Sequence, residues 1–149
     1  MRIEEHINQD PENLIVTLLN TAQGTVWTSS GLVSDFFRRE RFRQAVESAA
    51  AKCYQFRFLL DEDVDWEEKK VEFPWLARLV AEELIFVKKS TEPIPHWLII
   101  DGKHFRLEKP HAQGKVITNN LEIWEAGTPL ADMLRNRFDS WWKNATALG

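Results

Sequence analysis

The sequence predicts an α/β fold with a mixed, largely parallel sheet flanked by helices. Apolar residues at helical spacing alternate along the chain with short runs of β-branched and aromatic residues, which are typical of strands. The Asp101-Gly102 pair between two apolar runs predicts a β-hairpin, so the end of the sheet is expected to be antiparallel. A chain of 149 residues suits one hydrophobic core, and we expect a single domain over residues 1–149.

The first half of the chain alternates predicted helices and strands. Asp10 and Pro11 are typical of a helix start and Gly24 of a helix end, although the β-branched residues leave a strand open as the alternative. We then expect a strand over 25–28, a helix from Ser34 to about Lys52, and a strand over 54–60. The strongly charged residues 61–70 are expected to form a connection. This alternation favours parallel neighbours in the first part of the sheet.

The second half predicts a helix, several strands and a closing helix. A helix is expected over residues 74–83 and a buried strand over 84–87, after which Pro93 and Pro95 require an extended loop. The hairpin strands cover 96–101 and 103–107, a loop covers 109–115, and a further strand covers 121–124. Thr128 and Pro129 begin the closing helix, whose apolar stripe ends at two tryptophans.

Composition and charge exclude several functional classes. The net charge is −4, with 19 Lys and Arg against 23 Asp and Glu, so non-specific nucleic-acid binding is not favoured. The first residues lack the apolar core of a signal peptide, and no apolar stretch approaches the roughly 20 residues that span a bilayer. A cytoplasmic protein without a membrane span is therefore expected. The single cysteine, Cys53, lies beside an apolar run, which favours a buried, unreactive thiol.

The order of these elements, together with four passages of sequence, resembles one half of the phospholipase D superfamily fold. Residues 96–102, His-Trp-Leu-Ile-Ile-Asp-Gly, stand where that family carries its signature His-x-Lys followed by Asp. The other passages are residues 22–29, residues 45–61 and residues 120–141. The resemblance covers most of the chain and implies the α/β architecture of one such half.

The resemblance also implies a phosphodiester-cleaving chemistry, which this sequence departs from. In the family the motif histidine attacks the phosphodiester, the lysine binds the phosphate, and a second histidine protonates the leaving group. His96 matches the histidine, but Leu98 stands at the lysine position and Asp101 comes two residues too early. Two copies of the motif meet across a two-fold axis in that family, so a chain with one copy is expected to form a homodimer.

The candidate site residues follow from this resemblance. His96 is the candidate catalytic residue, and Glu108 nearby would repel an anion. A rebuilt ligand- or phosphate-binding site is expected to draw on Lys103, Arg106, Lys109, His111 and Asn120.

Other constellations favour structural roles. The histidines at positions 96, 104 and 111 are not expected to converge, so neither a metal site nor a cofactor is predicted. Asp101 and Glu122 are expected to form a turn and a local bond or an arginine pair, rather than an acid–base pair. Trp124, Trp141 and Trp142 are expected to be buried in the core or against a second copy of the chain.

The predicted function is a catalytically degenerate phospholipase D-like domain that acts as a homodimeric binding or regulatory module for an anionic ligand or a protein partner. The alternative is a divergent phosphodiesterase or nuclease that uses His96 from two subunits. A third class, a nucleic-acid-associated module, requires the basic residues between 38 and 43 to form one continuous patch with Lys103, Arg106 and Lys109.

Overall fold

The computed structural model describes residues 1–110 and 118–148 as helices packed on an eight-stranded sheet. In chain order the elements are β1 (Arg2–Gln9), α1 (Glu12–Thr21), β2 (Thr25–Ser30), the 3₁₀ helix η1 (Asp35–Arg38), α2 (Glu40–Lys52), β3 (Gln55–Leu60), α3 (Trp66–Glu72), α4 (Pro74–Ala81), β4 (Phe86–Lys89), β5 (Trp97–Ile100), β6 (His104–Glu108), β7 (Thr118–Trp124), α5 (Thr128–Asn144) and β8 (Thr146–Leu148).

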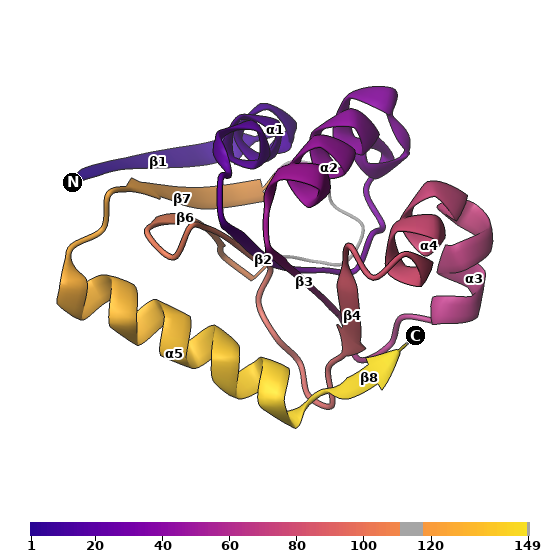
Figure 1. Cartoon of the computed structure of the whole chain (residues 1–149). Helices are drawn as coiled ribbons and strands as arrows, with labels where there is room; N and C mark the ends of the chain where they lie inside the picture. Colours follow the sequence, from indigo (N-terminus) through magenta and orange to yellow (C-terminus); the bar gives the residue numbers. More distant parts are fainter. Residues whose placement is uncertain (111–117, 149) are drawn as a thin grey trace.

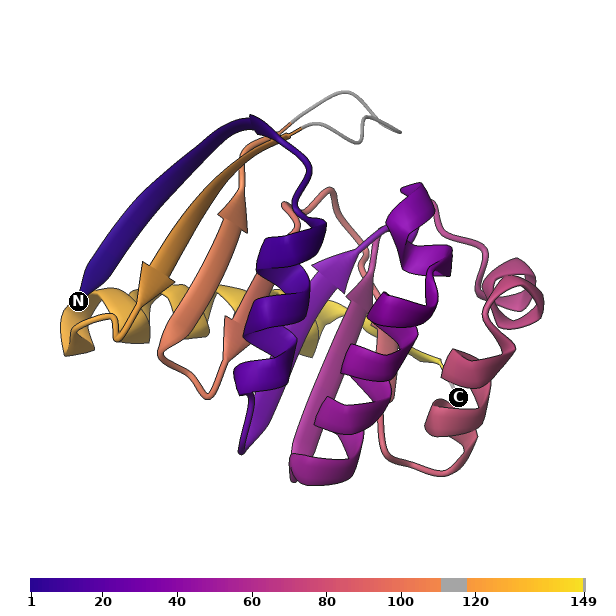
Figure 2. The ribbon, with the colours of Figure 1, turned by 90° about the horizontal axis from the view of Figure 1, so that it is seen from above.

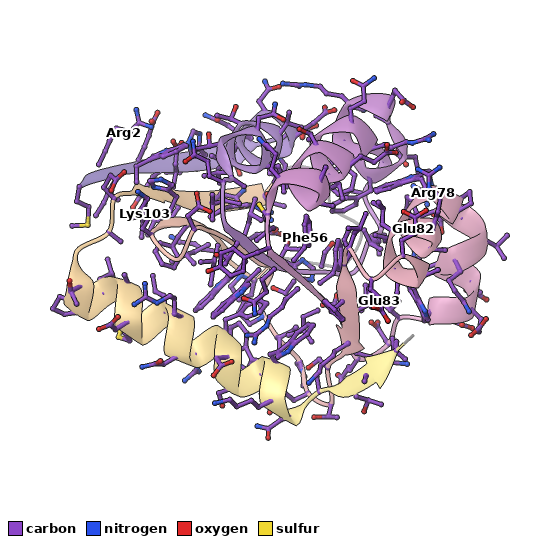
Figure 3. The ribbon with its side chains drawn as sticks, in the orientation of Figure 1. Arg2, Phe56, Arg78, Glu82, Glu83 and Lys103 are labelled. Carbon is purple, nitrogen blue, oxygen red and sulfur yellow. The ribbon has the colours of Figure 1, made fainter. Side chains whose placement is uncertain are left out.

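The helices cover both faces of the sheet. Figure 1 shows α1 and α2 on one face and α5 on the other, while α3 and α4 lie on the β4 side of the molecule. The core on the α1 and α2 face includes Leu18 and Phe56, and Figure 3 shows Phe56 in the interior beside these helices. The core on the α5 face includes Phe105 and Phe138. Among the described residues, no helix is sufficiently long and apolar to cross a membrane.

The sheet is mixed, as the sequence predicts. Its strand order is β1-β7-β6-β5-β2-β3-β4-β8. Only β2–β3 and β3–β4 are parallel, and the other five of the seven pairings are antiparallel. The parallel part is therefore smaller than expected, because the hairpin strands and both terminal strands join the sheet antiparallel.

Several local predictions are confirmed and others need correction. The Asp101-Gly102 hairpin forms with both residues at positive φ, 54° and 68°. The helix expected from Ser34 is instead η1 followed by α2, because Arg39 between them is extended at φ −84° and ψ 146°. The charged connection contains α3, whose start is capped by the Asp65 side chain accepting hydrogen bonds from two backbone N–H groups.

The two terminal strands, β1 and β8, were not predicted from the sequence. β1 lies at one edge of the sheet and pairs antiparallel with β7, and β8 lies at the other edge beside β4 (Figures 1 and 2). Most of β1 is exposed on both faces, including Ile3 and Ile7. A strand exposed on both faces has no apolar–polar alternation, which is the signal that identifies strands in a sequence.

One end of the sheet gathers termini of six strands. β2 and β3 are parallel and finish there, at Ser30 and Leu60. β5 runs antiparallel to β2 and begins there, and β6 ends there at Glu108. β7 begins at the same end, where Thr118 pairs with Gln9 at the end of β1. Segments that are distant in sequence therefore meet at this end, as is typical of ligand sites in α/β sheets.

Candidate functional site

A cavity of about 550 Å³ lies at this end of the sheet. Its apolar wall comes mainly from the segment after β2 and from the segment before β5, and its polar groups come from the strand ends. Its lining includes Gly31, Val33, Asp61, His96, Arg106 and Glu108. The volume falls in the range of ordinary small-molecule sites, and mostly apolar walls with a few polar groups are typical of such sites.

The polar centre of the cavity is a pair formed by His96 and Asp61. His96 Nε2 lies 2.9 Å and 2.8 Å from the two carboxylate oxygens of Asp61. The buried Ser29 holds the backbone on both sides of His96: its hydroxyl donates to the Pro95 carbonyl and accepts from the Trp97 N–H, each at 2.8 Å. The backbone on both sides of the imidazole is thus held by one hydroxyl, and the imidazole faces a carboxylate.

A second polar group, on β6 and β7, is an internally compensated ion pair. The Arg106 guanidinium is buried and donates hydrogen bonds to Glu108 and, at 2.8 Å, to Asn120 Oδ1. Asn120 in turn donates to the Thr118 hydroxyl at 2.8 Å. Burial lowers the pKa of Arg106, and the neighbouring Glu108 charge only partly offsets this effect. The hydrogen bonds of the buried Arg106 guanidinium are therefore made to protein groups.

The charges around the cavity do not favour a phosphate. Asp61, Glu62, Asp63 and Glu108 line it, against Arg106 and Lys109 among the described residues. Glu108 Oε2 also lies 4.0 Å from His96 Nδ1, so the imidazole faces carboxylates on both sides. Among the residues that the structure describes, a phosphodiester in the cavity would meet more negative than positive charge, and such repulsion is strengthened where burial lowers the dielectric.

The structure brings together only part of the site predicted from the sequence. His96, Arg106 and Lys109 line the cavity, and Asn120 supports Arg106. Lys103 does not belong with them: it lies in the β5–β6 turn, at the other end of the strands, with its ammonium 3.5 Å from Glu125 (Figure 3). The prediction on His111 lies outside the described residues.

Asp61 is the site residue that sequence reasoning did not select. It directly follows the buried end of β3, and its N–H donates to the Ser30 carbonyl at 3.2 Å. Gly31 allows its close packing, because a Cβ at Gly31 would lie 2.7 Å from Asp61 Oδ2. An acidic residue directly after a buried parallel strand was the available signal, since such ends form ligand sites.

Predictions outside the cavity are confirmed in full or in part. The Asp101 carboxylate accepts hydrogen bonds from the backbone N–H groups of residues 23, 24 and 25 and so ties the hairpin turn to the start of β2. Glu122 forms an ion pair with Arg2 at 3.2 Å and accepts a bond from Trp124 on its own strand. Trp141 and Trp142 are buried as predicted, whereas Trp124 is only partly buried. Cys53 was predicted to be buried but is half-buried, and this burial raises the pKa of its thiol.

Three of the four arginines between 38 and 43 form ion pairs with carboxylates. Arg38 bonds Glu72, Arg39 lies 2.5 Å from Glu12, and Arg43 lies 2.5 Å from Glu47, while Arg41 donates to the neutral Asn13. Arg106 is buried and Lys103 lies at the opposite end of the strands, so the continuous patch required for the nucleic-acid hypothesis is not present among the described residues.

Comparison with solved structures identifies the fold. No protein-family model matches the sequence, and no curated protein matches it. Nuc from Salmonella typhimurium, a phospholipase D family member, matches 99% of this chain over 99% of its own, with a TM-score of 0.72 and 12% identity. NucT from Helicobacter pylori matches equally well in extent and TM-score, at 10% identity.

A longer structure is similar as well. TrmBL2, an archaeal chromatin protein with a novel mode of DNA binding, matches with a TM-score of 0.75 and 12% identity, but this chain spans only 54% of it. At these identities the likeness concerns the fold, which is phospholipase D-like: a mixed α/β sheet with helices on both faces.

Proposed function

We propose that this protein is a phospholipase D-like binding module without phosphodiesterase activity, and that its ligand occupies the cavity beside His96. The observation that supports this proposal most directly is the buried ion pair of Arg106 and Glu108 at the cavity wall. An arginine neutralised by an adjacent carboxylate gives little net stabilisation to the negative charge of a phosphoryl transition state. The phospholipase D-like fold is kept, while the positive charge of Arg106, which could stabilise an anion, is neutralised by Glu108.

The cavity favours a small, uncharged organic ligand with an apolar body and a polar group. Apolar side chains such as Leu32, Phe36 and Ile94 supply the walls, and the His96–Asp61 pair supplies the hydrogen bonds. The acidic lining disfavours the anionic ligand that the sequence suggested. Burial of the apolar body would provide most of the affinity, at about 25 cal/mol per Å² of apolar surface removed from water.

The neutral fluorescent probe N-phenyl-1-naphthylamine tests whether the cavity takes such a ligand. We expect its fluorescence to rise on binding, and Val33→Trp to weaken binding by at least about tenfold, or roughly 1.4 kcal/mol, because the indole fills the cavity. Val71→Trp is the matched control, since Val71 is exposed on α3 and does not line the cavity. Equal binding by both variants would place the probe elsewhere and contradict the proposal.

The second candidate function, a divergent phosphodiesterase, is favoured by one observation: an imidazole paired with a carboxylate faces a cavity, an arrangement used for general acid–base chemistry. Bis(p-nitrophenyl) phosphate tests it directly. We expect the wild-type protein and His96→Ala to show the same background hydrolysis. Turnover by the wild type that disappears in His96→Ala would establish the enzyme and overturn the binding module.

We further propose that the module is a homodimer, as the sequence resemblance implies, and that it is cytoplasmic, as the composition of the chain suggests. The exposed edge strand β1, with Ile3 and Ile7 accessible, is compatible with a second copy. Static light scattering should give twice the chain mass.

DNA binding, known for the chromatin protein TrmBL2, is expected here to be absent, so a generic oligonucleotide should show no steeply salt-dependent binding.

A further inference from the structure

A group of metal-ligating side chains lies away from the cavity, where β1 pairs with β7. Glu4 lies directly opposite Glu122 in the strand register, and His6 is two residues further along β1. Residues two apart on a strand project from the same face, so the three side chains converge. One ligand atom from each lies within 4.8 Å of the other two.

Neighbouring side chains orient the histidine of this group. His6 Nδ1 lies 3.1 Å from Gln9 Oε1. Because an amide oxygen accepts only, Nδ1 carries the hydrogen, and Nε2 points at Glu122 Oε1, 2.7 Å away. A metal-binding histidine usually donates its other ring N–H to an oxygen acceptor, which fixes the tautomer as Gln9 does here.

Glu122 is oriented by separate contacts. Its Oε2 receives hydrogen bonds from Arg2 Nη2, at 3.2 Å, and from the Trp124 indole. The other oxygen, Oε1, is thereby directed towards His6. Glu122 is buried, so its carboxylate has little freedom to turn away. The site thus has two preset ligand atoms, Nε2 and Oε1, and an exposed third carboxylate at Glu4.

The register places two negative charges side by side. Two carboxylates directly opposite each other across a strand pair destabilise the pairing, and Glu4 and Glu122 hold such positions. The Arg2 guanidinium contacts Oε2 of Glu122, whereas Oε1 points at His6. A metal ion bound between the three ligand atoms would offset the repulsion of the two carboxylates.

We propose that Glu4, His6 and Glu122 form a binding site for a divalent transition-metal ion, and that Zn²⁺ is the ion that suits them. One imidazole and two carboxylates at about 2.0–2.2 Å are ordinary zinc ligands, with water completing the tetrahedron. Accepting the ion requires Nε2 and Oε1 to separate from 2.7 Å to roughly 3.3 Å, which small side-chain rotations provide. Mg²⁺ and Ca²⁺ prefer oxygen ligands alone and should bind weakly.

Isothermal titration of the chelator-treated, full-length protein with ZnCl₂ tests the site. We expect one site per chain that Glu4→Gln weakens by about tenfold or more, because a charged ligand becomes neutral. Glu5→Gln makes the same charge change on the opposite face of β1 and should leave the affinity unchanged. Glu4 is exposed, so its substitution is compatible with folding.

Two further variants distinguish the loss of a metal ligand from a general change of charge near the site. His6→Ala should abolish the site, and Gln9→Ala should weaken it about tenfold through loss of the tautomer-fixing partner. The proposal is overturned if the wild type binds no Zn²⁺, or if Glu4→Gln and Glu5→Gln bind equally. Zinc affinity that survives His6→Ala would also overturn it, because the ion would then be held by other residues.

Discussion

Two histidines of this protein contact carboxylates at nearly the same distance, yet their surroundings assign them different roles. His96 Nε2 lies 2.8 Å from Asp61, and His6 Nε2 lies 2.7 Å from Glu122. His96 borders an apolar cavity beside a buried arginine–glutamate pair. His6 lies on a sheet edge, with an amide on its other nitrogen and a further carboxylate close by. The pair itself does not determine function; the groups around it do.

The cavity wall and the β1–β7 edge differ in how their charged side chains are compensated. At the cavity, Arg106 and Glu108 are buried and compensate each other. At the β1–β7 edge, the side chain of Arg2 remains 65% exposed while it contacts Glu122. Buried charges depend on their protein partners, whereas exposed charges exchange them for water at little cost. The same substitution should therefore have very different effects in the two regions.

The largest predicted effect is that of Arg106→Ala on stability. Removing the guanidinium leaves the Glu108 carboxylate buried beside a cavity, and we expect a loss of about 3–5 kcal/mol in the free energy of unfolding. Arg2→Ala, the matched change at the sheet edge, should cost less than about 1 kcal/mol. Urea denaturation monitored by tryptophan fluorescence measures both values.

A double substitution is the control for this prediction. Arg106→Met combined with Glu108→Leu removes both charges and should recover most of the lost stability, because no charge is left uncompensated. Equal losses for Arg106→Ala and Arg2→Ala would mean that water reaches the ion pair and that the cavity wall is not buried.

The second prediction breaks the His96–Asp61 pair without touching either side chain. A methyl group at Gly31 would lie 2.7 Å from Asp61 Oδ2, so Gly31→Ala should push the carboxylate away from the imidazole. We expect a loss of about 1–3 kcal/mol from overpacking. Gly127→Ala is the control, since its methyl group would meet nothing within 4 Å. If the His96 ring resonances in NMR spectra are unchanged in Gly31→Ala, the pair does not depend on this close packing.

Local features of the sequence predicted much of the fold. The α/β order, the Asp101-Gly102 hairpin and the closing helix each have a signal within a few residues. β1 has no such signal, because its exposed faces carry no alternation and its stability comes from pairing with β7. The site at Glu4 and His6 depends on that strand, so it could not be inferred before the strand was placed.

The cavity was predictable only in part, for a similar reason. His96 and Arg106 were selected from their own neighbourhoods in the sequence. Asp61 lies 35 positions before His96, and only the placement of β5 and β3 on either side of β2 brings the two together. Lys103 was grouped with Arg106 in the predicted site, but Lys103 lies in the β5–β6 turn, whereas Arg106 lies midway along β6 and lines the cavity.

The smallest predicted effect concerns pH and uses a third histidine, His104. Burial, and then the charge of Lys103, lower the pKa of His104, and the Glu125 charge does not compensate. Its Nδ1 accepts the Glu125 N–H at 3.1 Å, a bond that only the neutral ring can make. The pKa of His6, by contrast, is raised. Proton NMR titration should therefore place the two rings on opposite sides of the ordinary value of 6.5.

The two shifts have opposite consequences for stability. For His104 the unfolded chain takes up a proton at a pH where the folded chain does not, so this histidine lowers stability as pH falls below about 6.5. His6 binds its proton more tightly when folded, so its contribution is full below 6.5 and is lost as pH rises through the raised pKa. His104→Asn, whose side-chain oxygen can accept the same N–H, should reduce the loss of unfolding free energy between pH 7 and pH 5.5. An unchanged loss in this variant would show that His104 is protonated in the folded protein, and that its contact with the Glu125 N–H is not maintained.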